Sequence, residues 1–265
     1  MRRLSVALFV TVSAVCFSHL ASAADLPVKA PIYKAPVAPP PYNWTGFYVG
    51  GNIGYSWGNV DSAFFSPDLP SIGLPATFPD TVKPQGVIGG GQIGYNWQAS
   101  PNWVFGIETD FQGSGQKDSH RFTQNFTVVG AGPGTATVTH EEKLEWFGTV
   151  RGRIGYAFWD NVMLYGTGGL AYGQVSTAVA GFGGTAFASG GGSVSGSTTK
   201  VGWTVGGGVE GAIPNTRNWT WKIEYLYMDL GTANYTFSVP SPSGYFTLSN
   251  KITDNILRGG INYRF

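Results

Sequence analysis

The sequence is poor in charge, in cysteine and in long apolar runs. Only 12% of its 265 residues are Asp, Glu, Lys or Arg, and 16 basic residues nearly balance 15 acidic ones. With no basic excess to approach phosphates, nothing in the charge balance indicates a nucleic-acid partner. Beyond residue 23, no apolar run approaches the ~20 residues that a membrane-spanning helix needs. If the mature chain enters a membrane, it must therefore do so as strands.

The first 23 residues have the composition of a secretory signal peptide. A basic start and an apolar stretch from Leu4 to Phe17 precede Ala21-Ser22-Ala23, which matches an A-x-A cleavage site. Cys16, the only cysteine, lies inside this segment, so we expect a mature chain that begins at Ala24 and has no disulfide. Removal of the two arginines in the segment leaves 14 basic residues against 15 acidic ones, a net charge of −1.

Glycine is abundant, with 40 residues in the chain, roughly twice the ordinary usage of ~7%. Disordered chains are poor in aromatic residues, whereas 15% of this chain is Phe, Trp or Tyr, so the composition argues against disorder. Residues 24–43 differ, because they are rich in Pro and Ala and favour extended polyproline conformation. We interpret them as a periplasmic tether that precedes one folded domain, residues 44–265.

Apolar side chains recur at every second position along this domain, which is typical of strands. The eight segments with this pattern are 47–57, 87–97, 103–112, 143–158, 162–172, 200–210, 219–228 and 256–265. The phase of segment 162–172 is ambiguous, because Leu164 and Leu170 compete with Met163 and Tyr165. A soluble sheet would bury the apolar face in a core, whereas a membrane barrel turns it toward lipid.

The spacers between the segments alternate in length, which favours the barrel. The long ones are 58–83, 113–142, 174–199 and 231–250, and the short ones are 98–102, 159–161 and 212–218. Outer-membrane barrels have long extracellular loops and short periplasmic turns. The sequence therefore predicts an all-β fold: an eight-stranded antiparallel up-and-down transmembrane β-barrel with four long extracellular loops and three short turns. Both chain ends would then be periplasmic.

Aromatic residues at the segment ends would form girdles at the two membrane interfaces. These residues are Trp44, Trp57, Trp97, Trp103, Tyr156, Trp159 and Trp219. The opposite face carries five acids and six bases, which we expect to pair in the lumen. They are Glu108, Asp110, Glu145, Arg151, Arg153, Lys200, Glu210, Lys222, Glu224, Arg258 and Arg264. A structural role for this network is favoured over a narrow ion path, since unpaired buried charges are unfavourable.

Several stretches resemble the small opacity-type outer-membrane barrels of Gram-negative bacteria, described as outer-membrane immunogenic or porin-family proteins. The matching residues are 44–55 (WTGFYVGGNIGY), 151–156 (RGRIGY), 164–173 (LYGTGGLAYG), 203–210 (WTVGGGVE), 222–225 (KIEY) and 258–265 (RGGINYRF). The resemblance spans residues 44–265 and implies a barrel without a shared established activity. It also implies that the C-terminal aromatic residues Tyr263 and Phe265 form the signal read by the barrel assembly machinery.

Other motifs carry little functional weight. Residues 206–211 match the dinucleotide pattern G-x-G-x-x-G but lie within an alternating strand instead of opening a helix. His120 and His140 lie in the second long spacer beside Asp118, Glu141 and Glu142, where we expect solvated loop residues because their spacing fits no established metal motif. We therefore expect no metal, no cofactor and no enzymatic activity.

Two functions remain open. The first is a structural and surface-interaction protein that reinforces the envelope and presents its loops outward; the second is a small porin for ions or small solutes. The spacer 174–199 has no charge, and the spacer 58–83 is rich in apolar residues. Such segments could contact lipopolysaccharide, a host or another cell, or could extend the barrel above the membrane. The expected partners are outer-membrane lipid, lipopolysaccharide, the assembly machinery and surface ligands.

Overall fold

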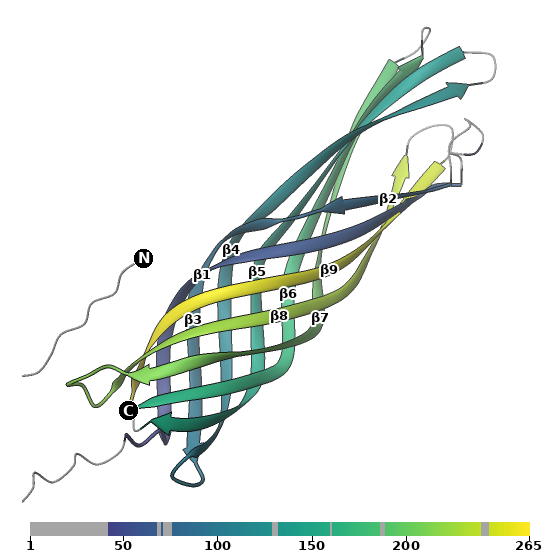
Figure 1. Cartoon of the computed structure of the whole chain (residues 1–265). Coiled ribbons are helices and arrows are strands. Elements are labelled where there is room, and N and C mark those ends of the chain that lie inside the picture. The colour runs from purple at the N-terminus through teal and green to yellow at the C-terminus, as the bar shows by residue number, and fades with distance from the viewer. Residues whose placement is uncertain are drawn as a thin grey trace, which may run out of the picture. The chain divides into compact units, whose positions relative to one another are not determined.

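The fold is seen in a computed structural model, which describes residues 42–67, 70, 76–128, 132–159, 161–185, 189–239 and 244–265 (Figure 1). The expected signal peptide, residues 1–23, and the tether up to residue 41 lie outside the described residues. Within the described ranges, no helix is long and apolar enough to cross a membrane.

The described residues form one antiparallel sheet. Its strands are β1 (Gly46–Phe65), β2 (Thr77–Val82), β3 (Gln85–Gln98), β4 (Trp103–Val128), β5 (Gly132–Trp159), β6 (Val162–Thr185), β7 (Ser189–Ala212), β8 (Trp219–Val239) and β9 (Gly244–Arg264). Neighbouring strands follow the order β2-β1-β3-β4-β5-β6-β7-β8-β9, and β1 also pairs with β9. This last pairing, from Tyr48↔Arg264 to Phe65↔Thr247, closes the sheet on itself.

The described sheet has nine strands where eight were expected, and the additional strand is the six-residue β2. β3 pairs with residues 46–57 of β1, and β2 pairs with residues 60–65 of the same strand. Lys83 and Pro84 interrupt the strand between them, and Gly58 donates its N–H to the Pro84 carbonyl at 2.7 Å. Proline has no N–H for a sheet ladder, which explains a break at this point.

Alternation places apolar side chains outside and polar ones inside along the part of the sheet near the short turns. The ambiguous segment in β6 has its leucines outside: Leu164 and Leu170 are 55% and 60% exposed, while Met163 and Tyr165 are buried. Cross-strand pairing with β5 fixes this register, because a slip of one residue would turn every side chain to the opposite face.

The spacers expected as long loops are mostly strand. β4 and β5 pair as far as Val128↔Gly132, β6 and β7 as far as Gly184↔Ser189, and β8 and β9 as far as Val239↔Gly244. Figure 1 shows these strand ends projecting far from the short turns. Small Gly, Ser and Thr residues replace many apolar residues there. The period-two apolar pattern is therefore weak in these segments, although their backbones still pair as strands.

An apolar core fills the interior of these extended strands. Its buried members are Val60, Phe64, Ile88, Leu144, Phe147, Ala171, Val175, Val179, Leu226, Met228, Leu230, Ala233, Tyr235, Leu248, Ile252 and Ile256. The core draws on β1, β3, β5, β6, β8 and β9. Burial of this much apolar surface stabilises this part of the sheet.

Close packing of the inner face makes Gly94 a test position. A Cβ at Gly94 would lie 2.4 Å from the Tyr48 ring and 2.7 Å from the Ile107 carbonyl oxygen, whereas one at Gly91 would meet only the Gly50 oxygen at 3.6 Å. We expect Gly94→Ala to lower the free energy of unfolding by ~1–3 kcal/mol, since overpacking strains a filled interior. Thermal unfolding in detergent measures this, with Gly91→Ala as the control. Equal midpoints for the two variants would contradict the packing argument.

Candidate functional site

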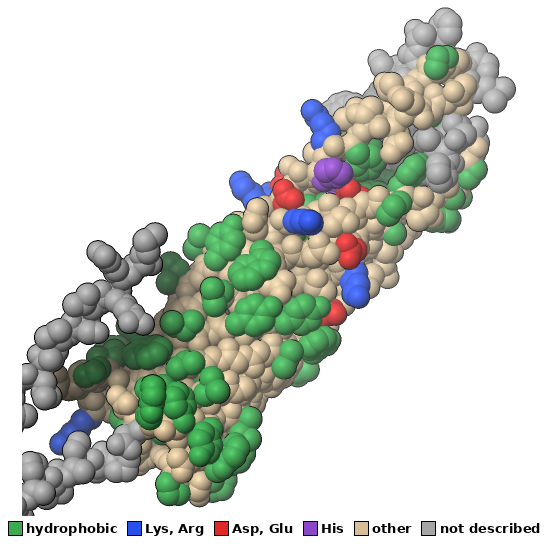
Figure 2. Space-filling model, viewed as in Figure 1, with side chains coloured by type: hydrophobic (Ala, Val, Ile, Leu, Met, Phe, Trp, Pro, Cys, Tyr) green, Lys and Arg blue, Asp and Glu red, His purple; other side chains and the backbone are tan. Residues whose placement is uncertain are grey.

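The outer surface of the sheet divides into an apolar zone and a charged zone. Figure 2 shows hydrophobic side chains gathered toward the end with the short turns, and most charged side chains beyond them. We call the apolar zone the belt; its exposed aromatic members include Phe47, Trp57, Trp97, Trp103, Phe111, Tyr156, Trp159, Trp203, Trp219 and Phe265. Such a belt with aromatic girdles is the surface that a membrane barrel presents to lipid.

Glu108 on β4 lies at the centre of the interior charge network at the level of the belt. Its carboxylate accepts hydrogen bonds from Tyr48 Oη at 2.8 Å, Arg151 Nη2 at 2.5 Å and Lys222 Nζ at 2.9 Å. These donors come from β1, β5 and β8, so one carboxylate connects four strands across the interior. All four side chains are buried, and buried charges require such compensation.

Two arginines extend the network to further carboxylates. Arg151 contacts Asp110 Oδ2 and Glu224 Oε1, both at 2.9 Å, and Arg258 on β9 contacts the same two side chains at 2.9 Å and 2.6 Å. Both guanidinium groups are fully buried. Arginine suits this position because its planar fork of donors reaches several carboxylates at once.

A second part of the network lies around Arg153. Its Nη2 contacts Glu210 at 2.6 Å, and its guanidinium carbon lies 4.1 Å from the Tyr165 ring centroid. Thr220 and Asn262 also donate hydrogen bonds to Glu210, at 2.7 Å and 3.2 Å. Each ion here thus has neighbours from more than one strand.

Three of the charges predicted for the lumen lie apart from this network. Glu145 is exposed on the outer face, where Ser176 Oγ donates to it at 2.7 Å; the register shift between Leu144 and Trp146 reverses its direction. Arg264 lies near the end of β9, with its guanidinium 4.3 Å from the Tyr42 ring centroid. Lys200 is partly buried on β7. Period-two counting misplaces Glu145 because a bulge adds one residue to the strand.

The expectation of solvated loop histidines is wrong for His140. His140 is completely buried inside the extended strands, between Asp80 at 3.0 Å and Glu142 at 2.9 Å. His120 on β4 is exposed over half its side chain and contacts Asp80 at 2.6 Å. Asp80 belongs to β2, far away in sequence, so no local spacing could reveal this cluster. No group of three metal-ligating side chains suited to a metal ion occurs among the described residues.

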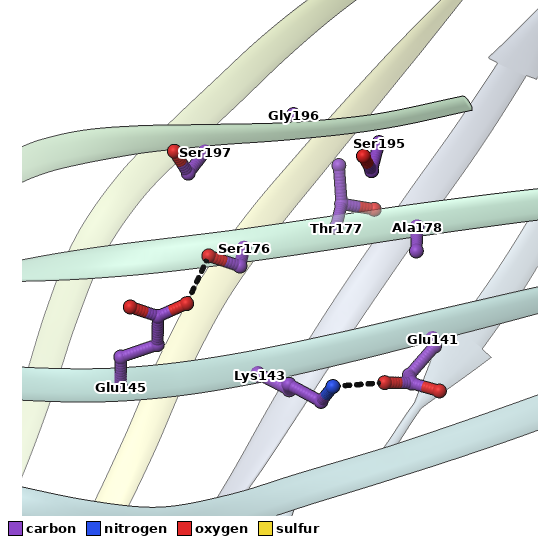
Figure 3. A pocket seen from close by; sticks show the side chains of 9 residues that line it. All are labelled: Glu141, Lys143, Glu145, Ser176, Thr177, Ala178, Ser195, Gly196 and Ser197. Carbon is purple, nitrogen blue, oxygen red and sulfur yellow. Dashed lines mark hydrogen bonds and ion pairs between the residues drawn. The ribbon is translucent and has the colours of Figure 1, made fainter.

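The outer face of β5, β6 and β7 bears a polar hollow of about 430 Å³ beyond the belt (Figure 3). It is lined by Glu141, Lys143, Glu145, Ser176, Thr177, Ala178, Ser195, Gly196 and Ser197. Lys143 pairs with Glu141 at 2.5 Å, and Ser176 bonds to Glu145. Hydroxyl groups and both signs of charge therefore face outward here.

The buried network and the exposed Glu145 provide matched carboxylates for a stability test. We expect Glu108→Ala to lower the free energy of unfolding by ~3–5 kcal/mol, because it leaves Arg151 and Lys222 buried without their shared partner. We expect Glu145→Ala to change it by at most ~1 kcal/mol, since its contacts are solvated. Urea unfolding of both variants in detergent compares them. Equal losses would show that the interior ion pairs do not hold the strands together.

Comparison with known proteins agrees with this architecture. Residues 9–265 match the outer membrane protein beta-barrel domain family. The chain is 42% identical over 254 residues to the 31 kDa outer-membrane immunogenic protein of Brucella melitensis, covering 95% of this chain and 96% of that protein. It is 32% identical to the 22 kDa outer membrane protein of Rhizobium leguminosarum, covering 88% and 82% of the two chains.

A more distant relative matches over the full length of both chains: the 25 kDa outer-membrane immunogenic protein of Brucella abortus is 29% identical. The family match covers all the strands of the described sheet and its charged interior. The chain therefore belongs to the outer membrane protein beta-barrel domain family and resides in the outer membrane of a Gram-negative bacterium.

Proposed function

We propose that the protein is a closed structural barrel that reinforces the outer membrane and presents its extended strands to the exterior. The observation that carries this proposal is the ion network across the interior. Arg151, Lys222 and Arg258 are at most 1% exposed, and their carboxylate partners come from facing strands. A conducting pore needs a water-filled path, which would leave such cations hydrated.

The apolar core supports the same proposal. It lies beyond the charge network along the strands, with Phe147, Leu226 and Ile256 each fully buried. An ion that crossed the barrel would have to displace this core before it reached the network. Moving an ion from water into an apolar interior is strongly unfavourable. The interior is therefore built for packing, which disfavours the small-porin alternative.

We place the membrane-spanning part in eight strands, β1 and β3 to β9, with β2 outside the membrane. Exposed apolar residues of the belt occur on all eight of these strands, and Phe265 directly follows β9. An even number of antiparallel strands closes a sheet without an edge in lipid. The short turns would be periplasmic and the extended strands extracellular. Phe265 is 76% exposed beside Tyr263, which suits the role of both in recognition by the assembly machinery. No enzymatic role is proposed.

Conductance measurements in planar lipid bilayers test whether the barrel is closed. We expect purified native protein to give no stable, reproducible single-channel steps, because the ion network and the apolar core block the interior. A general porin reconstituted in the same way serves as the positive control for insertion. Regular steps that depend on protein concentration would overturn the closed-barrel proposal in favour of a small porin.

Lysines beyond the belt suggest how the exterior contacts its surroundings. The exposed ones are Lys83, Lys117, Lys143 and Lys251. Lys117 and Lys143 lie directly opposite each other on β4 and β5, where their like charges repel, although Lys143 also pairs with Glu141. We infer that this charged zone contacts phosphates of lipopolysaccharide, and that the hydroxyl-rich hollow beside it faces the saccharide.

A double variant tests this contact. We expect Lys117→Gln with Lys143→Gln to weaken binding of purified lipopolysaccharide by roughly thirtyfold, because each of the two lysines near an anionic membrane surface contributes ~1 kcal/mol. Titration of labelled protein in detergent at low salt measures the affinity. Arg217→Gln, an exposed charge on the turn after β7, is the matched control. The same loss in control and double variant would contradict a specific contact at this zone.

A further inference from the structure

The short strand β2 is held to the barrel by two different means. Its backbone pairs with β1 from Val60↔Val82 to Phe65↔Thr77. Asp80, at the middle of β2, points into the barrel and is 8% exposed. Among the described residues, β1 is the only strand whose backbone pairs with β2. Side chains therefore determine whether β2 stays against β4 and β5.

Asp80 connects β2 to two histidines. One carboxylate oxygen lies 2.6 Å from His120 Nδ1 on β4, and the other lies 3.0 Å from His140 Nδ1 on β5. On its far side, His140 Nε2 lies 2.9 Å from Glu142 Oε1. Asp80 and Glu142 thus face opposite nitrogens of one buried imidazole ring. We call Asp80, His120, His140 and Glu142 the histidine clamp.

Uncharged groups complete the surroundings of the clamp. They are Phe64 from β1, Thr177 from β6, Tyr235 from β8 and Asn250 from β9. Burial raises the pKa of Tyr235, and the charge of Glu142 raises it further, so this hydroxyl stays neutral. Asn250 donates a hydrogen bond to Glu142 Oε1, while Glu142 Oε2 has no partner among the described residues. The only charges that face His140 are therefore those of the clamp itself.

While Asp80 and Glu142 are ionised, the geometry of the clamp is satisfied only with a proton on both ring nitrogens of His140. A neutral imidazole has one N–H donor and one lone pair, so one of the two carboxylates would face a lone pair. Only the imidazolium form donates to Asp80 and Glu142 together. Burial by itself lowers the pKa of His140, but the hydrogen bonds and charges of Glu142 and Asp80 outweigh it and raise the pKa above its ordinary value.

We propose that the histidine clamp is a pH-sensitive fastening on the outer part of the barrel, which holds β2 against β4 and β5 when protonated and releases it when the proton is lost. The pKa in the folded state is raised, so the stabilisation is fully present below the ordinary histidine value of ~6.5. It is lost as the pH rises through the folded-state pKa. Acidic surroundings would fix this extracellular surface, and alkaline surroundings would loosen it.

The distance between β2 and β4 provides the direct test. In a Cys16→Ser background, Thr81→Cys on β2 and Ser119→Cys on β4 place spin labels on exposed positions. We expect one narrow distance distribution at about pH 5 and a longer, broader one at about pH 9, on either side of the ordinary pKa of ~6.5. An identical distribution at both pH values would overturn the proposal.

Substitutions and a second measurement separate the clamp from other effects of pH. The variant His140→Gln cannot be protonated, so we expect the broad distribution at both pH values; a persisting transition would overturn the proposal. The exposed Arg121 on β4 lies outside the clamp and provides the control, so Arg121→Gln should retain the transition. If His140→Gln fails to fold, an NMR titration of the native protein decides. A midpoint for His140 above ~6.5 supports the clamp, and one below that value contradicts it.

Discussion

Compensation of buried charge is the constraint on which the rest of this structure depends. The outer face meets lipid, so polar side chains of the spanning strands must point inward, where water is scarce. Glu108, Asp110 and Glu224 are tolerated there only because Arg151, Arg258 and Lys222 reach them from adjacent and facing strands. The same contacts fix the strand register, because an acid and its basic partner can pair only when they lie at the same level along the barrel axis. The pairing of inward-facing charges therefore accounts for both the strand register and the filled interior.

The sequence predicted the part of the fold that lipid constrains most strongly. Strict alternation in the eight segments reflects apolar contact outside and charge pairing inside, and the expected carboxylates and guanidinium groups do meet, as Glu108 and Arg151 show. The sequence predicts loops where the extended strands lie, because β6 and β7 carry Gly, Ser and Thr there. Without lipid, either small or apolar side chains can face outward, so the pattern loses contrast although the backbone pairing continues.

Features that depend on irregular geometry could not be predicted from alternation. Glu145 is directed outward by a bulge at Leu144 and Trp146, and no residue type marks that bulge. The cluster around His140 forms because β2 brings Asp80 next to a strand that lies 60 positions further along the chain. The spacing of residues within one segment gives no information about a contact between strands that are distant in sequence. The same holds for the apolar core inside the extended strands, whose members come from six different strands.

The ladder between β1 and β9 has a consequence for biogenesis. It joins residue 48 to residue 264, so the first strand must wait for the last one before the ring can close. Contacts between such distant positions form late, because the entropy of the intervening chain opposes them. Until synthesis and export are finished, both margins of the sheet remain available to other chains. Pairing of these margins with other chains thus competes with closure of the ring during transit.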